Sequence, residues 1–127
     1  MFRSSPQERG TAYAETLTEA TPKIILHPEA VADLGDIWDY IAADNIDAAD
    51  AFLAEIERAI LLIGEFPKMG SANRNLGPDS MRVHPVREYL IVYAIDEQPT
   101  LVLAVLHGRR NPHLIGAILQ ERERRRS

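Results

Sequence analysis

The stretch from residue 88 to residue 107, EYLIVYAIDEQPTLVLAVLH, contains two apolar runs of strand length. The polar sequence DEQP between them predicts the turn of a β-hairpin. Because side chains alternate across a strand, the first run is apolar on both faces, with Tyr89, Ile91, Tyr93 and Ile95 on one and Leu90, Val92 and Ala94 on the other. Such a strand pair is expected in the centre of a sheet, with other elements covering both sides.

Two further segments complete the predicted sheet. Residues 81–86, MRVHPV, form a short strand in which Pro85 favours an edge position or a break. Residues 23–27, KIILH, form an N-terminal strand of β-branched and aliphatic side chains. Residues 68–80 are rich in Gly, Asn, Ser and Pro and are expected to form a loop. We therefore expect a mainly antiparallel sheet of about four strands.

The segment between the first strand and this loop has a helical period. Pro28 is expected at the start of a first helix. Asp47 is expected to cap a second helix, which Pro67 ends. The stripes consist of Ala30, Leu34, Ile37, Trp38 and Ile41, and of Ala49, Phe52, Leu53, Ile56, Ile60 and Ile63. Two amphipathic helices with a short link predict an antiparallel helical hairpin.

Three aspartates, Asp33, Asp36 and Asp39, lie off the first apolar stripe. Successive steps of three residues rotate around a helix, so this spacing is typical of a solvated helix face. We expect no metal site there. The sequence also contains no glycine-rich phosphate loop, and we expect no cofactor.

The chain ends in a short predicted helix followed by charged residues. Asn111 and Pro112 favour a helix start, and the apolar residues of the helix are Leu114, Ile115, Ile118 and Leu119. The fold class is therefore α+β, with an N-terminal strand, a helical hairpin packed on the sheet, and a short C-terminal helix. We expect a flexible arm over residues 1–22, one domain over residues 23–120, and a charged tail over residues 121–127.

Composition and charge limit the possible functions. The chain has 127 residues, enough for one domain, and contains no cysteine, which excludes disulfides, a thiol nucleophile and a cysteine-based zinc site. It has no apolar stretch long enough to span a membrane and no apolar core of a signal peptide, so we expect a cytoplasmic protein. Its net charge is −5. Residues 29–66 carry ten acidic side chains and one arginine, for −9, whereas residues 82–127 carry eight arginines and five acidic side chains, for +3.

The final strand leads into HGRRN, at residues 107–111, which holds His107, Arg109 and Arg110. Arginine grips phosphate or carboxylate through two parallel hydrogen bonds, so this cluster predicts a site for an anionic group. Structural roles are the alternative. His107 could cap the strand by bonding the neighbouring backbone, and the two arginines could pair with the acidic helices.

Four segments, in this order, resemble the RelE/ParE superfamily of toxins from type II toxin–antitoxin modules. Residues 27–42, HPEAVADLGDIWDYIA, and 48–70, AADAFLAEIERAILLIGEFPKMG, are similar to its two helices and the P-x-x-G exit. Residues 81–95 resemble its strand pair, and VLHGRRNP, at 105–112, resembles its final strand. The resemblance covers about 90 positions, from Ile24 to about Ile115, and the P-x-x-G and HGRR endings favour the ParE branch.

The resemblance implies a growth-inhibiting toxin that a cognate antitoxin neutralises. ParE-like members are associated with poisoning DNA gyrase, whereas RelE-like members cleave mRNA on the ribosome; an inert member that only binds antitoxin is a third alternative. For gyrase binding, the target-binding candidates are Arg82, Arg87, His107, Arg109 and Arg110. We favour this reading and assign no catalytic residue.

A metal-free ribonuclease would need a general base, a general acid and arginines directed at the phosphate. The candidates for that chemistry are Arg82, His107, Arg110 and His113, with His84 as a further histidine that is more typical of a surface strand. No tyrosine follows Arg110, unlike in RelE-like enzymes. A chain of net −5 is also poorly suited to ribosomal RNA, whose affinity for proteins comes largely from neutralised phosphates.

Overall fold

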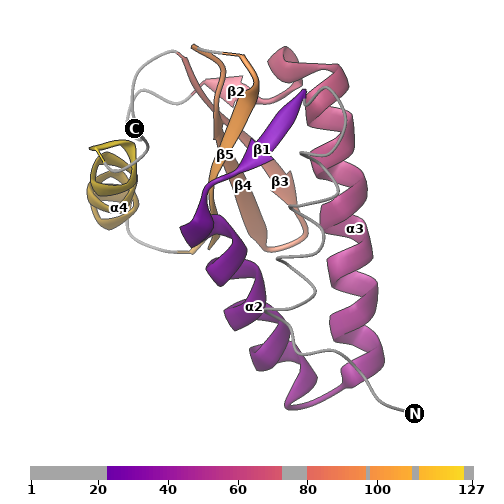
Figure 1. Cartoon of the computed structure of the whole chain (residues 1–127). Helices are drawn as coiled ribbons and strands as arrows, with labels where there is room; N and C mark the ends of the chain where they lie inside the picture. The colour runs from indigo at the N-terminus through magenta and orange to yellow at the C-terminus, as the bar shows by residue number, and fades with distance from the viewer. Residues whose placement is uncertain (1–22, 73–79, 97, 110–111, 125–127) are drawn as a thin grey trace.

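The computed structural model describes residues 23–72, 80–96, 98–109 and 112–124, with only the backbone for 112–114 (Figure 1). Its elements are β1 (Ile24–Leu26), α2 (Pro28–Ala42), α3 (Ile46–Glu65), the short 3-10 helix η1 (Pro67–Met69), β2 (Ser71–Ala72), β3 (Met81–Val86), β4 (Tyr89–Ala94), β5 (Thr100–His107) and α4 (Pro112–Arg124). The predicted α+β class is confirmed. The predicted arm over residues 1–22 lies outside the described residues.

The sheet has the strand order β1-β5-β4-β3-β2. The predicted hairpin of β4 and β5 lies in its centre, β1 runs parallel to β5, and the other neighbours are antiparallel. The expected number of about four strands is one too low, because Ser71 and Ala72 pair with Val83 and Arg82 inside the predicted loop. Two exposed residues carry no apolar alternation, so the sequence contains no strand signal there.

The helical hairpin follows the two predicted stripes closely. Nearly all of these side chains are buried, and Ile41 is partly buried. The predicted cap of the second helix is wrong: Asn45 caps α3, and its side chain accepts a hydrogen bond from the Ala48 amide at 3.0 Å. Asp47 lies instead inside the first helical turn, where its negative charge favours the helix N-terminus.

Helices cover both faces of the sheet, as the two-sided apolar pattern of the central hairpin predicts. The α2–α3 hairpin covers one face, and α4 lies across the other (Figure 1). On the hairpin side the core includes Ile56, Ile60, Ile91 and Val102. On the α4 side it includes Val92, Leu103, Leu106, Ile115 and Leu119.

Helix α4 continues to Arg124, into the charged end of the chain, where arginines suit a helix C-terminus. Its last turn carries Arg122, whose side chain is only 10% exposed. The guanidinium donates to both carboxylate oxygens of Asp33, at 2.6 and 3.0 Å. Asp33 was expected on a solvated face, and that expectation is wrong for this residue, whereas Asp36 and Asp39 are exposed as predicted.

This ion pair satisfies backbone groups at the edge of β5. Strand β1 pairs with β5 only as far as Val102, and Leu103 is an extra residue at a β-bulge between the positions that pair with Tyr93 and Val92. The Leu103 carbonyl accepts from Arg122 at 3.1 Å, and the Val105 amide donates to Asp33 at 3.0 Å. Arg122 as donor and Asp33 as acceptor thus make the hydrogen bonds that a neighbouring strand would otherwise make with this part of β5.

A second polar cluster fixes the chain where it leaves α3. The Tyr93 hydroxyl accepts from the Gly70 amide at 2.8 Å and donates to the Pro67 carbonyl at 2.7 Å. Arg82 donates to the Gly70 carbonyl at 3.0 Å. A Cβ atom on residue 70 would lie 2.5 Å from the Tyr93 hydroxyl, so only glycine fits in this position.

We expect Arg122→Ala to lower the free energy of unfolding by about 3–5 kcal/mol, because it leaves the Asp33 carboxylate without its partner. The matched control is Arg124→Ala, two residues along the same helix, because Arg124 is 75% exposed and forms a surface ion pair with Glu121. That variant should stay within about 0.5 kcal/mol of the unaltered protein. Urea unfolding measures both values, and equal midpoints would contradict the structural role of the pair.

We expect Tyr93→Phe to destabilise the fold at neutral pH by about 1–3 kcal/mol, because the buried Gly70 amide loses its acceptor. Burial raises the pKa of Tyr93 above its ordinary value of 10.0. The neutral phenol therefore stabilises the fold below that value, and this contribution is lost as the pH rises through the raised pKa. The melting temperatures of the two proteins should converge between about pH 8 and about pH 11. A difference that stays constant over this range would show that ionisation of Tyr93 does not oppose folding.

Candidate functional site

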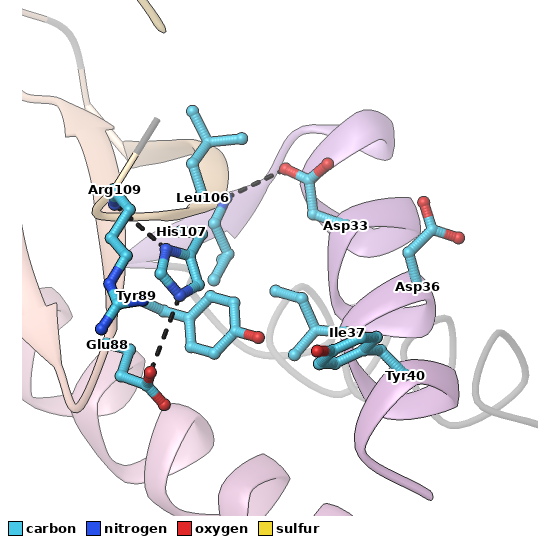
Figure 2. Close-up of a pocket in the computed structure, with 10 residues that line it drawn as sticks. Asp33, Asp36, Ile37, Tyr40, Glu88, Tyr89, Leu106, His107 and Arg109 are labelled. Carbon is cyan, nitrogen blue, oxygen red and sulfur yellow. Dashed lines mark hydrogen bonds and ion pairs between the residues drawn. The ribbon is translucent and has the colours of Figure 1, made fainter. Parts of the chain in front are cut away.

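The end of β5 forms one wall of a cleft of about 450 Å³. The opposite wall is α2, and the turn between β3 and β4 contributes the rest. Figure 2 shows His107 and Arg109 on one side and Asp36 and Tyr40 on the other. The complete lining is Asp33, Asp36, Ile37, Tyr40, Glu88, Tyr89, Val105, Leu106, His107 and Arg109.

His107 is held in a defined orientation at the mouth of this cleft. Its Nδ1 atom accepts a hydrogen bond from the Arg109 backbone amide at 3.0 Å, so this nitrogen carries no proton in that arrangement. Its Nε2 atom lies 3.8 Å from a carboxylate oxygen of Glu88. The ring also meets Tyr89 edge to face, with centroids 5.2 Å apart. The strand-capping role considered for His107 is therefore present, and the other ring nitrogen points toward Glu88 (Figure 2).

The cleft contains charges of both signs. Asp36 and Glu88 are exposed carboxylates, and Arg109 is an exposed cation. The charge of Asp33 is balanced by its ion pair with Arg122. The sequence predicted a positive spot around Arg109, and the structure differs because α2 brings acidic side chains to the facing wall. Such a surface complements a partner that presents both positive and negative groups.

Tyrosines make the cleft amphipathic. Tyr40 is 77% exposed and extends from α2, whereas Tyr89 is partly buried against Phe52. Burial raises the pKa of Tyr89, and the nearby charge of Glu88 raises it further. Each tyrosine offers an apolar ring with a polar tip, a combination common in protein interfaces.

Arg87 does not belong to the lining of this cleft. It occupies the β3–β4 turn with a φ of 55° and forms an ion pair with Glu55 of α3. This hydrogen-bonded pair raises the pKa of Arg87 and lowers that of Glu55. The structural alternative for Arg109 and Arg110 was an ion pair with the acidic helical hairpin. In the structure, Arg87 of the β3–β4 turn forms such a pair.

Arg82 also lies away from the cleft. Its guanidinium donates to backbone carbonyls of Lys68 and Gly70, so it holds the exit of α3. His84 is partly exposed on β3, opposite Ile91, and does not line the cleft. Of the predicted site residues, the structure brings together His107 and Arg109. Arg110 and the side chain of His113 lie outside the described residues.

Sequence reasoning missed four residues of the cleft: Asp36, Tyr40, Glu88 and Tyr89. Asp36 and Tyr40 are four positions apart on a helix and therefore share a face, which is a signal in the sequence. No sequence pattern indicated that this face would lie opposite the β3–β4 turn. Among the described residues, no group of side chains could hold a metal ion, and no helix is long and apolar enough to cross a membrane.

Comparison with known proteins agrees with the architecture. No curated protein matches the chain. A family model described as the ParE toxin of type II toxin–antitoxin system, parDE, matches residues 24–112, which span the sheet, the helical hairpin and the start of α4. On this match over most of its length, the chain belongs to the ParE toxin family.

Proposed function

We propose that this toxin inhibits growth by binding and poisoning DNA gyrase, and that a cognate antitoxin neutralises it in the cytoplasm. Family membership makes it the toxin of a type II toxin–antitoxin system and implies an antitoxin partner. The observation that carries the choice of target is the cleft at the end of β5, where Arg109 faces Asp36 across about 450 Å³ of open space.

A mixed-charge cleft favours a protein target over RNA. RNA presents a continuous row of phosphates, and proteins bind it largely by neutralising them with Lys and Arg. Here Asp36 and Glu88 border the same cleft as Arg109, so a polyanion would meet repulsion beside the attractive contact. A protein surface can instead offer a carboxylate to Arg109 and a donor to Asp36.

The position of Arg109 suits it to anchor such a contact. Its backbone amide is fixed by His107, and His107 in turn contacts Tyr89 in the neighbouring strand. An arginine on a fixed backbone loses less freedom on binding than one on a mobile segment. Arg110 stays in the proposed contact surface on the strength of its sequence position alone.

A second candidate function is ribosome-dependent cleavage of mRNA, and the approach of His107 Nε2 to Glu88 favours it. A histidine, a carboxylate and an arginine in one cleft are the groups that a metal-free ribonuclease requires. Against this, the Asp36 and Glu88 carboxylates would oppose the entry of a phosphate. An inert member that binds only antitoxin is the third alternative.

We expect Arg109→Ala to weaken binding to purified gyrase by about ten- to a hundredfold, which corresponds to the 1.5–3 kcal/mol of a hydrogen bond to a charged group. Arg109→Lys should recover part of the affinity, because lysine keeps the charge but lacks the planar fork. Arg109 is exposed, so both melting temperatures should stay unchanged. Arg124→Ala serves as the matched exposed arginine and should bind normally. Titration of labelled gyrase measures all four proteins, and full affinity of Arg109→Ala would remove this residue from the contact.

Expression without antitoxin separates the candidate functions. Poisoning of gyrase should produce filamentous cells and DNA damage while translated mRNA stays intact. Primer extension that finds codon-phased cuts in translated messages would favour the nuclease. Normal growth, with tight binding of the antitoxin in calorimetry, would identify an inert member.

A further inference from the structure

A second cleft, of about 440 Å³, lies where α3 ends, and it does not belong to the site at the end of β5. We call it the α3-exit cleft. Its apolar lining comes from Phe66, Pro67, Met69 and Ile95, and Glu65 and Lys68 supply its charges. Large apolar side chains are exposed here to an unusual degree: Phe66 is 61% exposed and Met69 is 37% exposed.

The apolar surface extends beyond the cleft itself. Leu61 and Leu62, in the last two turns of α3, are 51% and 46% exposed. Four exposed apolar side chains therefore fall within nine consecutive residues, whereas single exposed apolar residues are scattered on most proteins. Leu62 precedes Phe66 by one helical turn, so these two exposed side chains lie on the same side of the helix end, and exposed apolar surface of this kind marks an interaction site.

The start of the described chain lies beside this cleft. The Lys23 ammonium group is 2.6 Å from a carboxylate oxygen of Glu65, one of the lining residues. The Lys23 carbonyl also accepts from the Thr100 amide at 3.0 Å, which ties this residue to the sheet. Twenty-two residues precede Lys23. They are thus covalently joined to the protein at the rim of the α3-exit cleft.

We propose that residues 11–20 of the same chain, TAYAETLTEA, cover the α3-exit cleft. Tyr13, Leu17 and Ala20 fall at spacings of four and three, which gives this segment one apolar side to set against Phe66. Its charged residues, Glu15 and Glu19, are both acidic and complement Lys68 of the cleft.

The short linker between this segment and Lys23 favours the segment over a second copy of the chain as the occupant of the cleft. Leu17 is six positions before Lys23, so it can reach up to about 20 Å from the rim of the cleft. A segment joined by so short a linker has an effective concentration in the millimolar range. A weak contact therefore suffices for intramolecular cover, whereas a second copy would need far higher affinity. The cover shields the apolar patch, and any partner that uses this patch must displace it.

Spin labelling tests the proposal, because the chain has no cysteine and a single one can be introduced. We choose Glu15→Cys, a position off the apolar side of the segment, carrying a nitroxide on the full chain. We expect loss of the backbone amide NMR signals of residues 61–69, apart from Pro67, which has no amide proton. The amides of residues 46–50 should keep their signals, because the two ends of the 20-residue helix α3 are about 30 Å apart.

Two substitutions on the spin-labelled chain supply the controls. Phe66→Ser removes the exposed ring at the cleft and should restore the signals of residues 61–69. Ile46→Ser, at the opposite end of α3 and similarly exposed at 48%, should leave the loss unchanged. Signals that survive in the labelled parent, or a loss that persists in Phe66→Ser, would overturn the proposal.

A mixing experiment distinguishes cover within one chain from contact between copies. Spin-labelled protein without isotopes is mixed with isotope-labelled protein that lacks the nitroxide. We expect full signals for residues 61–69 in this mixture. Their loss would overturn the proposal in favour of a second copy at the α3-exit cleft. None of these readouts involves gyrase or antitoxin, so they are independent of the proposed function.

Discussion

The ion pair between Asp33 and Arg122 joins three elements that are far apart in the sequence. It connects α2, on one face of the sheet, to α4, on the other, and it passes the edge of β5 where β1 stops. A strand edge with unsatisfied amide and carbonyl groups would invite pairing with another chain. Because Asp33 accepts from Val105 and Arg122 donates to Leu103, this edge is satisfied by side chains.

The same constraint shapes the cleft. Asp33 bonds the backbone of β5 directly, so α2 cannot move away from the strand that carries His107. Asp36 and Tyr40 follow Asp33 by three and seven positions and are thereby held on the wall that faces Arg109. The mixed charge of the cleft, on which the choice of a protein target depends, is therefore a consequence of how the fold closes its sheet edge.

Much of the fold was predictable because it rests on periodicity. The helical stripes and the central hairpin are buried as their patterns indicated. Asp33 was wrongly predicted to be solvated, because its spacing from Asp36 and Asp39 is typical of an exposed helix face. Its partner, Arg122, lies 89 positions away and leaves no local signal in the sequence. Of the site, His107 and Arg109 were predictable from the HGRRN ending. The sequence could not show that Arg87 lies outside the site, because it is an arginine like Arg109. Only the three-dimensional structure reveals its pairing with Glu55.

Hydrogen exchange of the Val105 backbone amide tests most directly whether the ion pair seals this edge. This amide points away from β4 and is protected only if the Asp33 carboxylate accepts it. The structure predicts slow exchange, comparable with that of the amides bonded between β4 and β5. Exchange of Val105 at the rate of a solvent-exposed amide, while the β4–β5 amides stay protected, would contradict it.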